Sequence, residues 1–249
     1  MIGITRRSGY WLVGAGVGLA ALSICYTFVP NLHGQGRGGQ QQAGPTPRTA
    51  DGHPDLSGRY LFAGGNPSQE SPVFRPETKA KYQSPVPSGA CVMGGTPTTI
   101  TMQTTEHGAI QLIQSPGALW ILAESPQSVI WIPTDGRPHS DDPDVSFIGE
   151  SVGRWESDTL VVDTVGIDAR MRNISVGLRG LVNAWTHSEK EHVIQRFSRP
   201  SKDALIYQVT VEDPDVLAKP FTSAPLRWSL AQGADDHWKP KVPIAGCDF

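Results

Sequence analysis

Short apolar runs recur along the chain from residue 109 onward, and turn-forming residues separate them. In the run 204–212 apolar residues occupy every second position from 205 to 211, and the positions between them are largely polar. This two-residue period is typical of a β-strand with two different faces. β-Branched and aromatic residues are common in the runs, and Gly, Pro, Asp or Ser stands between them. The pattern predicts strands over 109–114, 118–124, 128–133, 149–155, 159–164, 191–197, 204–212 and 225–231.

Successive runs lie close enough in sequence to be joined as hairpins. We therefore predict an all-β domain with little helix, built as an antiparallel meandering barrel that is lipocalin-like in general shape and has long loops; a β-sandwich is the alternative. In a closed barrel the polar face of 204–212 could line a wet cavity, whereas on an open sheet it would meet solvent. The Pro-rich stretch 64–97 is expected to form a long loop or a cap, and 168–190 a long excursion.

The amino-terminal segment has the pattern of an export signal. Arg6 and Arg7 precede residues 10–29, which are almost wholly apolar or small and long enough to persist as a membrane anchor. We expect 1–34 to be a signal peptide or N-terminal membrane anchor, 35–50 a flexible linker, and 51–249 a single β-rich domain. The protein is then periplasmic or secreted from a bacterial cell.

The net charge of the chain narrows the kinds of partner that it could bind. Two of the 21 Lys and Arg lie in the leader, so 19 remain against 24 Asp and Glu, a net charge of about −5. This balance predicts no nucleic-acid surface, and membrane contact only through an uncleaved N-terminal segment.

Outside the leader only Cys91 and Cys247 remain, and in an oxidising compartment they favour a disulfide. That bond would close a loop of about 150 residues, worth about 4–5 kcal/mol in the chain-entropy model.

An ordered set of motifs resembles a family of exported bacterial proteins that has no settled activity. The motifs are TADGHPDLSGRY (49–60), Cys91 before a Pro-containing loop, IQLIQSPGALWILAE (110–124), TDGRPH (134–139), GESVGRWESDTLVVDT (149–164), THSEKEHVIQRFSRP (186–200) and VTVEDPDVLAKPFT (209–222). The resemblance implies a secreted β-rich domain and no particular chemistry. Gln195 stands where the pattern usually has Glu, and 170–185 is divergent, so a role of that glutamate does not carry over.

Ionisable residues are densest between 135 and 150, and they suggest acid–base chemistry. We expect His139 to act as the acid or base, because an imidazole exchanges protons near neutral pH. Asp135 or Glu150 would orient it, and Arg137 would hold an anionic group or a developing oxyanion. His187 would approach from the opposite rim of the site. A solvated loop is the alternative for His139, and a structural salt bridge is the alternative for Arg137.

Other residues suit ligand binding or metal coordination by their side-chain type. Trp120 and Trp131, with Trp185 and Trp228, could line a cavity for an apolar or glycan-like ligand, and core packing is the alternative. His192 is expected to face solvent, and Asp163 and Asp213 to be structural. The candidate metal ligands lack the spacing of known metal sites, so we predict no metal; they are Asp135, His139, Glu150, His187 and His192.

These observations lead to three hypotheses. The first is an exported small-molecule enzyme, a lyase, isomerase or hydrolase, that uses acid–base chemistry in a β-barrel pocket without a cofactor. The chain has no Gly-x-Ser-x-Gly nucleophile motif and no Gly-rich phosphate loop before a helix, so nucleotide chemistry is not expected. The second is a periplasmic non-catalytic binding protein for an apolar or glycan-like ligand. The third is an envelope-associated structural or interaction domain.

Overall fold

A computed structural model describes most of the predicted domain. The segments 1–34 and 35–43 lie outside the described residues, as do Cys91 and Cys247, so the predicted leader and disulfide remain predictions. Within the part of the chain that is described, no helix is long and apolar enough to cross a membrane. The described residues are 44–65, 72–82, 96–101, 109–124, 127–170, 172–174 and 184–233.

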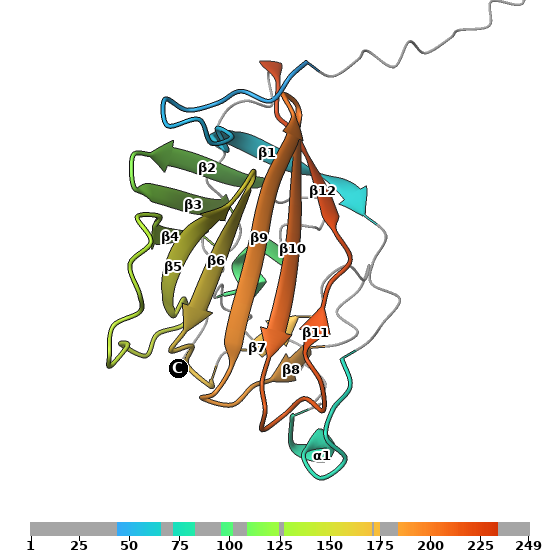
Figure 1. Ribbon diagram of the computed structural model, residues 1–249. Helices are drawn as coiled ribbons and strands as arrows, with labels where there is room; N and C mark the ends of the chain where they lie inside the picture. Colours follow the sequence, from blue (N-terminus) through green and yellow to red (C-terminus); the bar gives the residue numbers. More distant parts are fainter. Residues whose placement is uncertain are drawn as a thin grey trace, which may run out of the picture. The chain divides into compact units, whose positions relative to one another are not determined.

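The described chain is nearly all β-structure, as the alternation of apolar and polar residues predicts (Figure 1). Each of the eight predicted runs forms a strand with ends within a few residues of the expected ones. The two helices are single short turns, α1 (Lys79–Tyr82) and α2 (Thr98–Thr101). The strands are β1 (Gly58–Gly65), β2 (Ala109–Ser115), β3 (Ala118–Glu124), β4 (Gln127–Pro133), β5 (Glu150–Glu156), β6 (Thr159–Val165), β7 (Arg172–Ile174), β8 (Ala184–Thr186), β9 (His192–Ser201), β10 (Ala204–Glu212), β11 (Phe221–Thr222) and β12 (Leu226–Leu230).

One antiparallel sheet forms a nearly closed barrel, which confirms the predicted fold class. Its strand order is β4-β3-β2-β1-β12-β10-β9-β6-β5, and β11 pairs with β10 at one side. The edge strands β4 and β5 are not joined by a ladder, but they approach closely at Gly153. A Cβ atom at this position would lie 3.2 Å from both Ile132 Cγ2 and the carbonyl oxygen of Pro133. Glycine therefore lets β5 pass against the end of β4, where the curved sheet meets itself.

Apolar side chains fill the inside of the curved sheet. On β10, Leu205, Tyr207, Val209 and Val211 point inward and are buried, while the alternate residues from Ile206 to Glu212 are partly exposed on the other face. Other large side chains complete this core, including Tyr60, Leu112, Ile121, Leu160, Phe197 and Trp228, and Ile100 of α2 joins them. The polar face of 204–212 therefore lies on the outside of the barrel. A site in the barrel interior, as expected from the sequence, is not supported by these residues.

A buried polar contact joins Gln195 to Tyr207 in the core. The hydroxyl of Tyr207 donates a hydrogen bond to Gln195 Oε1 at 3.0 Å, and both side chains are buried. Burial raises the pKa of Tyr207 well above its ordinary value, so the phenol stays protonated and able to donate. A neutral amide suits this place, since a glutamate here would bring a charge into the core.

Residues 44–50, which the sequence assigns to the flexible linker, pack along the domain. The amide of Lys202 donates to the carbonyl of Gly44 at 3.0 Å, and Thr46 Oγ1 donates to the carbonyl of Arg199 at 2.7 Å. These bonds tie the segment to the β9–β10 turn. The ordered domain therefore begins earlier than position 51, because backbone groups near the turn offer partners that the local sequence does not reveal.

Candidate functional site

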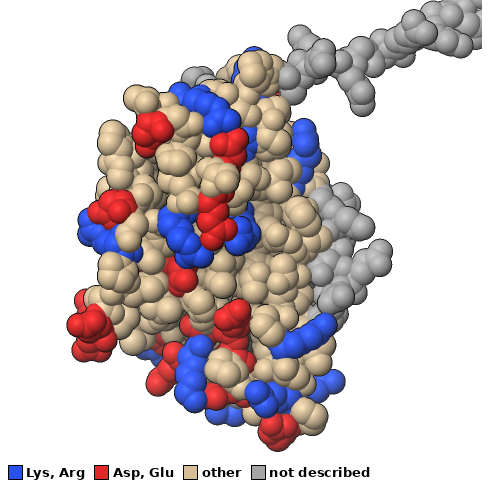
Figure 2. Space-filling view, viewed as in Figure 1, with Lys and Arg blue, Asp and Glu red and all other residues tan. Residues whose placement is uncertain are grey.

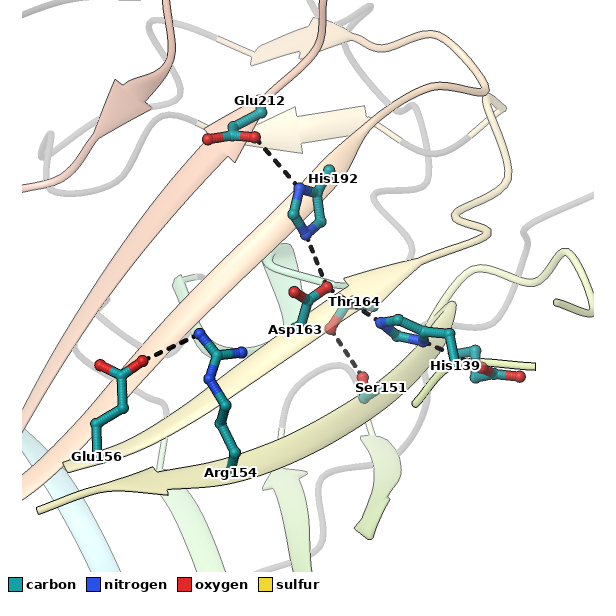
Figure 3. A network of polar contacts seen from close by, with 9 residues as sticks. His139, Ser151, Arg154, Glu156, Asp163, Thr164, His192 and Glu212 are labelled. Carbon is teal, nitrogen blue, oxygen red and sulfur yellow. Dashed lines mark hydrogen bonds and ion pairs between the residues drawn. The ribbon is translucent and has the colours of Figure 1, made fainter. Parts of the chain in front are cut away.

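Five ionisable side chains form a continuous chain of contacts on the outer face of the sheet. Figure 3 labels His139, Asp163, His192 and Glu212 of this chain. Glu150 Oε1 lies 3.0 Å from Nδ1 of His139, whose Nε2 lies 3.1 Å from Asp163 Oδ1. His192 Nε2 lies 2.7 Å from the same Asp163 oxygen, and His192 Nδ1 lies 3.3 Å from Glu212 Oε2. We call these five residues the relay. Its two imidazoles share one carboxylate oxygen, and each is held on its other side by a glutamate.

Strand register brings the relay together. His192 of β9 stands directly opposite Glu212 of β10. Asp163 of β6 stands opposite Ile194 of β9, so it is a diagonal neighbour of His192 on the same face. Glu150 begins β5, which pairs with β6. Three strands and the first residue of a fourth thus present these side chains on one rigid surface.

His139 comes from the loop between β4 and β5 and is fixed through Glu150. Ser140 donates its backbone N–H to Glu150 Oε1 at 2.8 Å and its hydroxyl to Oε2 at 2.5 Å. Both carboxylate oxygens of Glu150 are therefore engaged beside the imidazole. The loop is also tied to the end of β6, where the amide of Ser146 donates to the carbonyl of Gly166 at 3.0 Å. These contacts explain how a loop histidine can hold a defined position.

Hydrogen bonding favours the charged forms of three relay groups. The pKa of His192 is raised, mainly by its hydrogen bond to Asp163, against the opposing effect of burial. Burial acts to raise the pKa of Asp163, but hydrogen bonds from His192 and His139 outweigh it and lower the pKa. The pKa of Glu150 is lowered, chiefly by the hydroxyl and amide of Ser140. Ionised carboxylates at Glu150 and Asp163 can orient the imidazole of His139 between them.

The raised pKa of His192 predicts a pH-dependent contribution to stability. A group whose pKa is higher in the folded state stabilises it fully below the ordinary value of 6.5, and the contribution is lost as pH rises through the raised pKa. We expect the difference in unfolding free energy between the wild type and His192→Gln to shrink as pH rises above 6.5. Urea unfolding at a series of pH values measures this difference. A difference that stays constant across that range would contradict the assignment.

Asp135 and Arg137 belong to the same loop as His139 but bind each other rather than the imidazole. The guanidinium of Arg137 contacts both oxygens of Asp135, at 2.9 and 3.0 Å from Nε and 2.5 Å from Nη2. This pairing lowers the pKa of Asp135 to about 2. The Arg137 guanidinium also lies 5.9 Å from the ring centroid of Trp131. The sequence predicts Asp135 or Glu150 as the residue that orients His139. In the structure Glu150 contacts the imidazole, whereas Asp135 contacts Arg137 instead.

His187 belongs to a separate group of residues and does not contact the relay. It is buried, and its Nδ1 lies 2.9 Å from the carbonyl of Ser188 and 3.2 Å from Glu191 Oε2. Burial lowers the pKa of His187, which favours the neutral imidazole. The residue borders a depression of about 480 Å³ that is also lined by Lys190 and Asp215. The expected approach of His187 toward His139 is thus not observed.

The two expected ligand-binding tryptophans face outward. Trp120 and Trp131 are cross-strand partners on β3 and β4, are 38% and 47% exposed, and have ring centroids 6.3 Å apart. Neither packs in the core or lines the inside of the barrel. Trp228 is fully buried in the core, whereas the side chain of Trp185 lies outside the described residues.

Sequence reasoning did not assign three members of the relay to the acid–base site, namely Asp163, His192 and Glu212. Each is an ionisable residue at an outward position of a strand, separated from the next by 20 residues or more in sequence. Their closeness depends on the pairing of β6, β9 and β10, which short-range patterns do not encode. The available signal was the charged residue at position 163 inside the otherwise uncharged run 159–164.

Figure 2 shows that acidic and basic side chains are intermingled over the face of the molecule that it presents. On the relay's face, Glu156 forms ion pairs with Arg154 at 3.0 Å and Arg196 at 2.9 Å. Among the described residues, no group of three or more His, Cys, Asp or Glu side chains is arranged to hold a metal ion.

No family model, curated protein or solved structure matches this chain. The relay's geometry is therefore the main support for a functional proposal.

Proposed function

We propose that this protein is an exported enzyme that converts a small organic molecule by acid–base chemistry, as a lyase, isomerase or hydrolase, without a nucleotide cofactor. The single observation that carries the proposal is the convergence of two imidazoles on one oxygen of Asp163. Histidine can both accept and donate a proton near neutral pH, and a shared carboxylate couples the two rings. Ion pairs in solvent contribute little to the stability of a fold. Stability alone therefore does not account well for this arrangement.

The relay also reaches a concave surface. Glu212, at one end, lines a depression of about 340 Å³ beside the turn that follows β10. This volume is at the lower end of the range in which proteins bind small molecules. In the proposed enzyme, a proton leaves or enters the substrate in this depression and passes between Glu212 and His192. Asp163 and His139 then adjust the charge and orientation of His192.

Hydrogen–deuterium exchange into a panel of small molecules tests this proposal across several reaction types at once. The protein is incubated with hydroxy acids, unsaturated acids and esters in deuterated water, and NMR records deuterium uptake and product formation. We expect a substrate whose conversion falls about 10²–10⁴-fold in His192→Gln, the usual contribution of a general acid or base. His53→Gln is the control, because His53 stacks on Trp155 at 4.5 Å and lies outside the relay. Equal conversion by both variants and the wild type would refute the proposal.

A specific observation also favours the second candidate function, binding without turnover. Ile113, Trp120, Val129 and Trp131 form an exposed apolar strip on the outer face of β2, β3 and β4. Exposed apolar strips of this kind mark interaction sites, and tryptophan suits the apolar face of a sugar ring. Quenching of tryptophan fluorescence by oligosaccharides, lost in Trp131→Ala and accompanied by no product, would support this function in place of catalysis.

A further inference from the structure

The depression at Glu212 has a defined construction. It lies where β10 ends, between the turn 213–220 and the segment 72–78. Leu217 pairs with Phe74 in an isolated bridge, and the amide of Ala218 donates to the carbonyl of Val73 at 2.8 Å. These backbone bonds fix the two walls relative to each other. The depression is therefore part of the described fold rather than a gap between unconnected segments.

One wall carries an arginine whose stem is anchored and whose end is available. The amide of Arg75 donates to the carbonyl of Val216 at 2.9 Å, and its Nε donates to the carbonyl of Pro214 at 2.6 Å. Among the described residues, no acceptor contacts its Nη1 or Nη2. An arginine held at Nε with its terminal nitrogens open in this way is preorganised for a carboxylate, because less side-chain entropy is lost on binding.

The remaining wall is largely apolar, and an acidic group stands at the end of β10. Leu217, Ala218 and Pro220 line the depression together with Arg75 and Glu212, and Asp213, Pro214 and Lys219 complete its lining. Glu212 uses one carboxylate oxygen for His192, and the other has no described partner. A ligand in this space would meet an anchored guanidinium, an apolar surface and a carboxylate that is coupled to the relay.

We propose that this depression is the substrate site and that it takes a small organic carboxylate with an apolar body. The ligand carboxylate binds the terminal nitrogens of Arg75, and its apolar body packs on Leu217, Ala218 and Pro220. The part to be deprotonated or protonated then lies beside Glu212, away from the anionic end. The role of Glu212 rests on the proposed acid–base function, whereas the binding role of Arg75 stands on the depression alone.

Binding of benzoate to the full domain tests this site. We expect benzoate to bind in calorimetric or NMR titrations, and Arg75→Gln to weaken it about 10- to 100-fold, as befits the loss of hydrogen bonds to a charged group. Ala218→Trp, at an exposed position of the wall, should fill the depression and abolish binding. Benzyl alcohol lacks the charge and inorganic phosphate lacks the apolar body, so both should bind more weakly than benzoate.

Arg170→Gln is the matched control, because Arg170 is an exposed arginine that pairs locally with Asp168 outside the depression. It should leave benzoate binding unchanged. Equal weakening by Arg75→Gln and Arg170→Gln would show a general charge effect and overturn the site, as would the absence of benzoate binding. Arg75-dependent binding without His192-dependent conversion of any compound would keep the site and refute the acid–base function.

Discussion

Replacing Asp163 by Asn is expected to lower turnover about 10²–10⁴-fold, as much as His192→Gln does. Asn has nearly the same shape, but its amide cannot carry the negative charge that both imidazoles contact. It can also present an N–H group where an acceptor is needed. Coupling between His139 and His192 is therefore lost while the strand geometry is kept. Steady-state kinetics on the substrate found by deuterium exchange measures the effect.

Asp203→Asn is the control for this substitution. Asp203 lies in the β9–β10 turn with a partly exposed side chain, and it pairs with Lys202 at 3.9 Å rather than with a histidine. We expect turnover to stay near the wild-type value in this variant. Thermal unfolding of both variants checks that the fold persists. Similar rates in Asp163→Asn and Asp203→Asn, with both proteins folded, would remove Asp163 from the mechanism.

The largest expected effect on stability concerns the ion pair between Arg59 and Glu124. Both side chains are almost fully buried, and Glu124 Oε1 accepts hydrogen bonds from Nε at 3.0 Å and Nη2 at 2.8 Å. Glu124→Ala removes the carboxylate that contacts the buried guanidinium of Arg59. Breaking a buried pair in this way costs about 3–5 kcal/mol of unfolding free energy. Urea denaturation of the wild type and the variant measures the loss.

Two further variants separate burial from charge pairing. Asp158→Ala breaks the exposed pair between Arg48 and Asp158 and should change stability little. The double replacement Arg59→Met/Glu124→Leu removes both charges, and it should be more stable than Glu124→Ala because the buried guanidinium is removed together with the carboxylate that it contacts. A double variant as unstable as the single one would mean that packing rather than charge accounts for the loss.

The fold can be predicted well from the sequence because local alternation encodes it. In β10 the apolar residues at every second position define the buried face, and polar residues define the other. The sequence does not say which face a barrel encloses, so a wet cavity and a packed interior are both compatible with it. The structure resolves this because large side chains such as Tyr207 and Trp228 fill the interior. The alternation does not predict β1 as a strand, since its GRYLFAGG sequence contains three glycines.

The candidate site can be predicted only in part. His139 and Glu150 are 11 residues apart and flank one loop, so their proximity is visible as a dense charged stretch. The sequence predicts that His192 faces solvent, whereas Asp163 and Glu212 lie on either side of it. Such contacts between strands depend on sheet register, which is a property of the whole fold. For the same reason, sequence alone does not separate His187 from the relay.

The central claim is that Asp163 couples two histidines into one proton-transfer network. Nitrogen NMR of the imidazole rings in the wild type and in Asp163→Asn tests it most directly, since each ring has a nitrogen near Asp163 Oδ1. We predict that the Nε2 resonances of both His139 and His192 shift in the variant, while those of His53 stay in place. Unchanged resonances for either relay histidine in a folded variant would contradict the shared carboxylate and the proposal that depends on it.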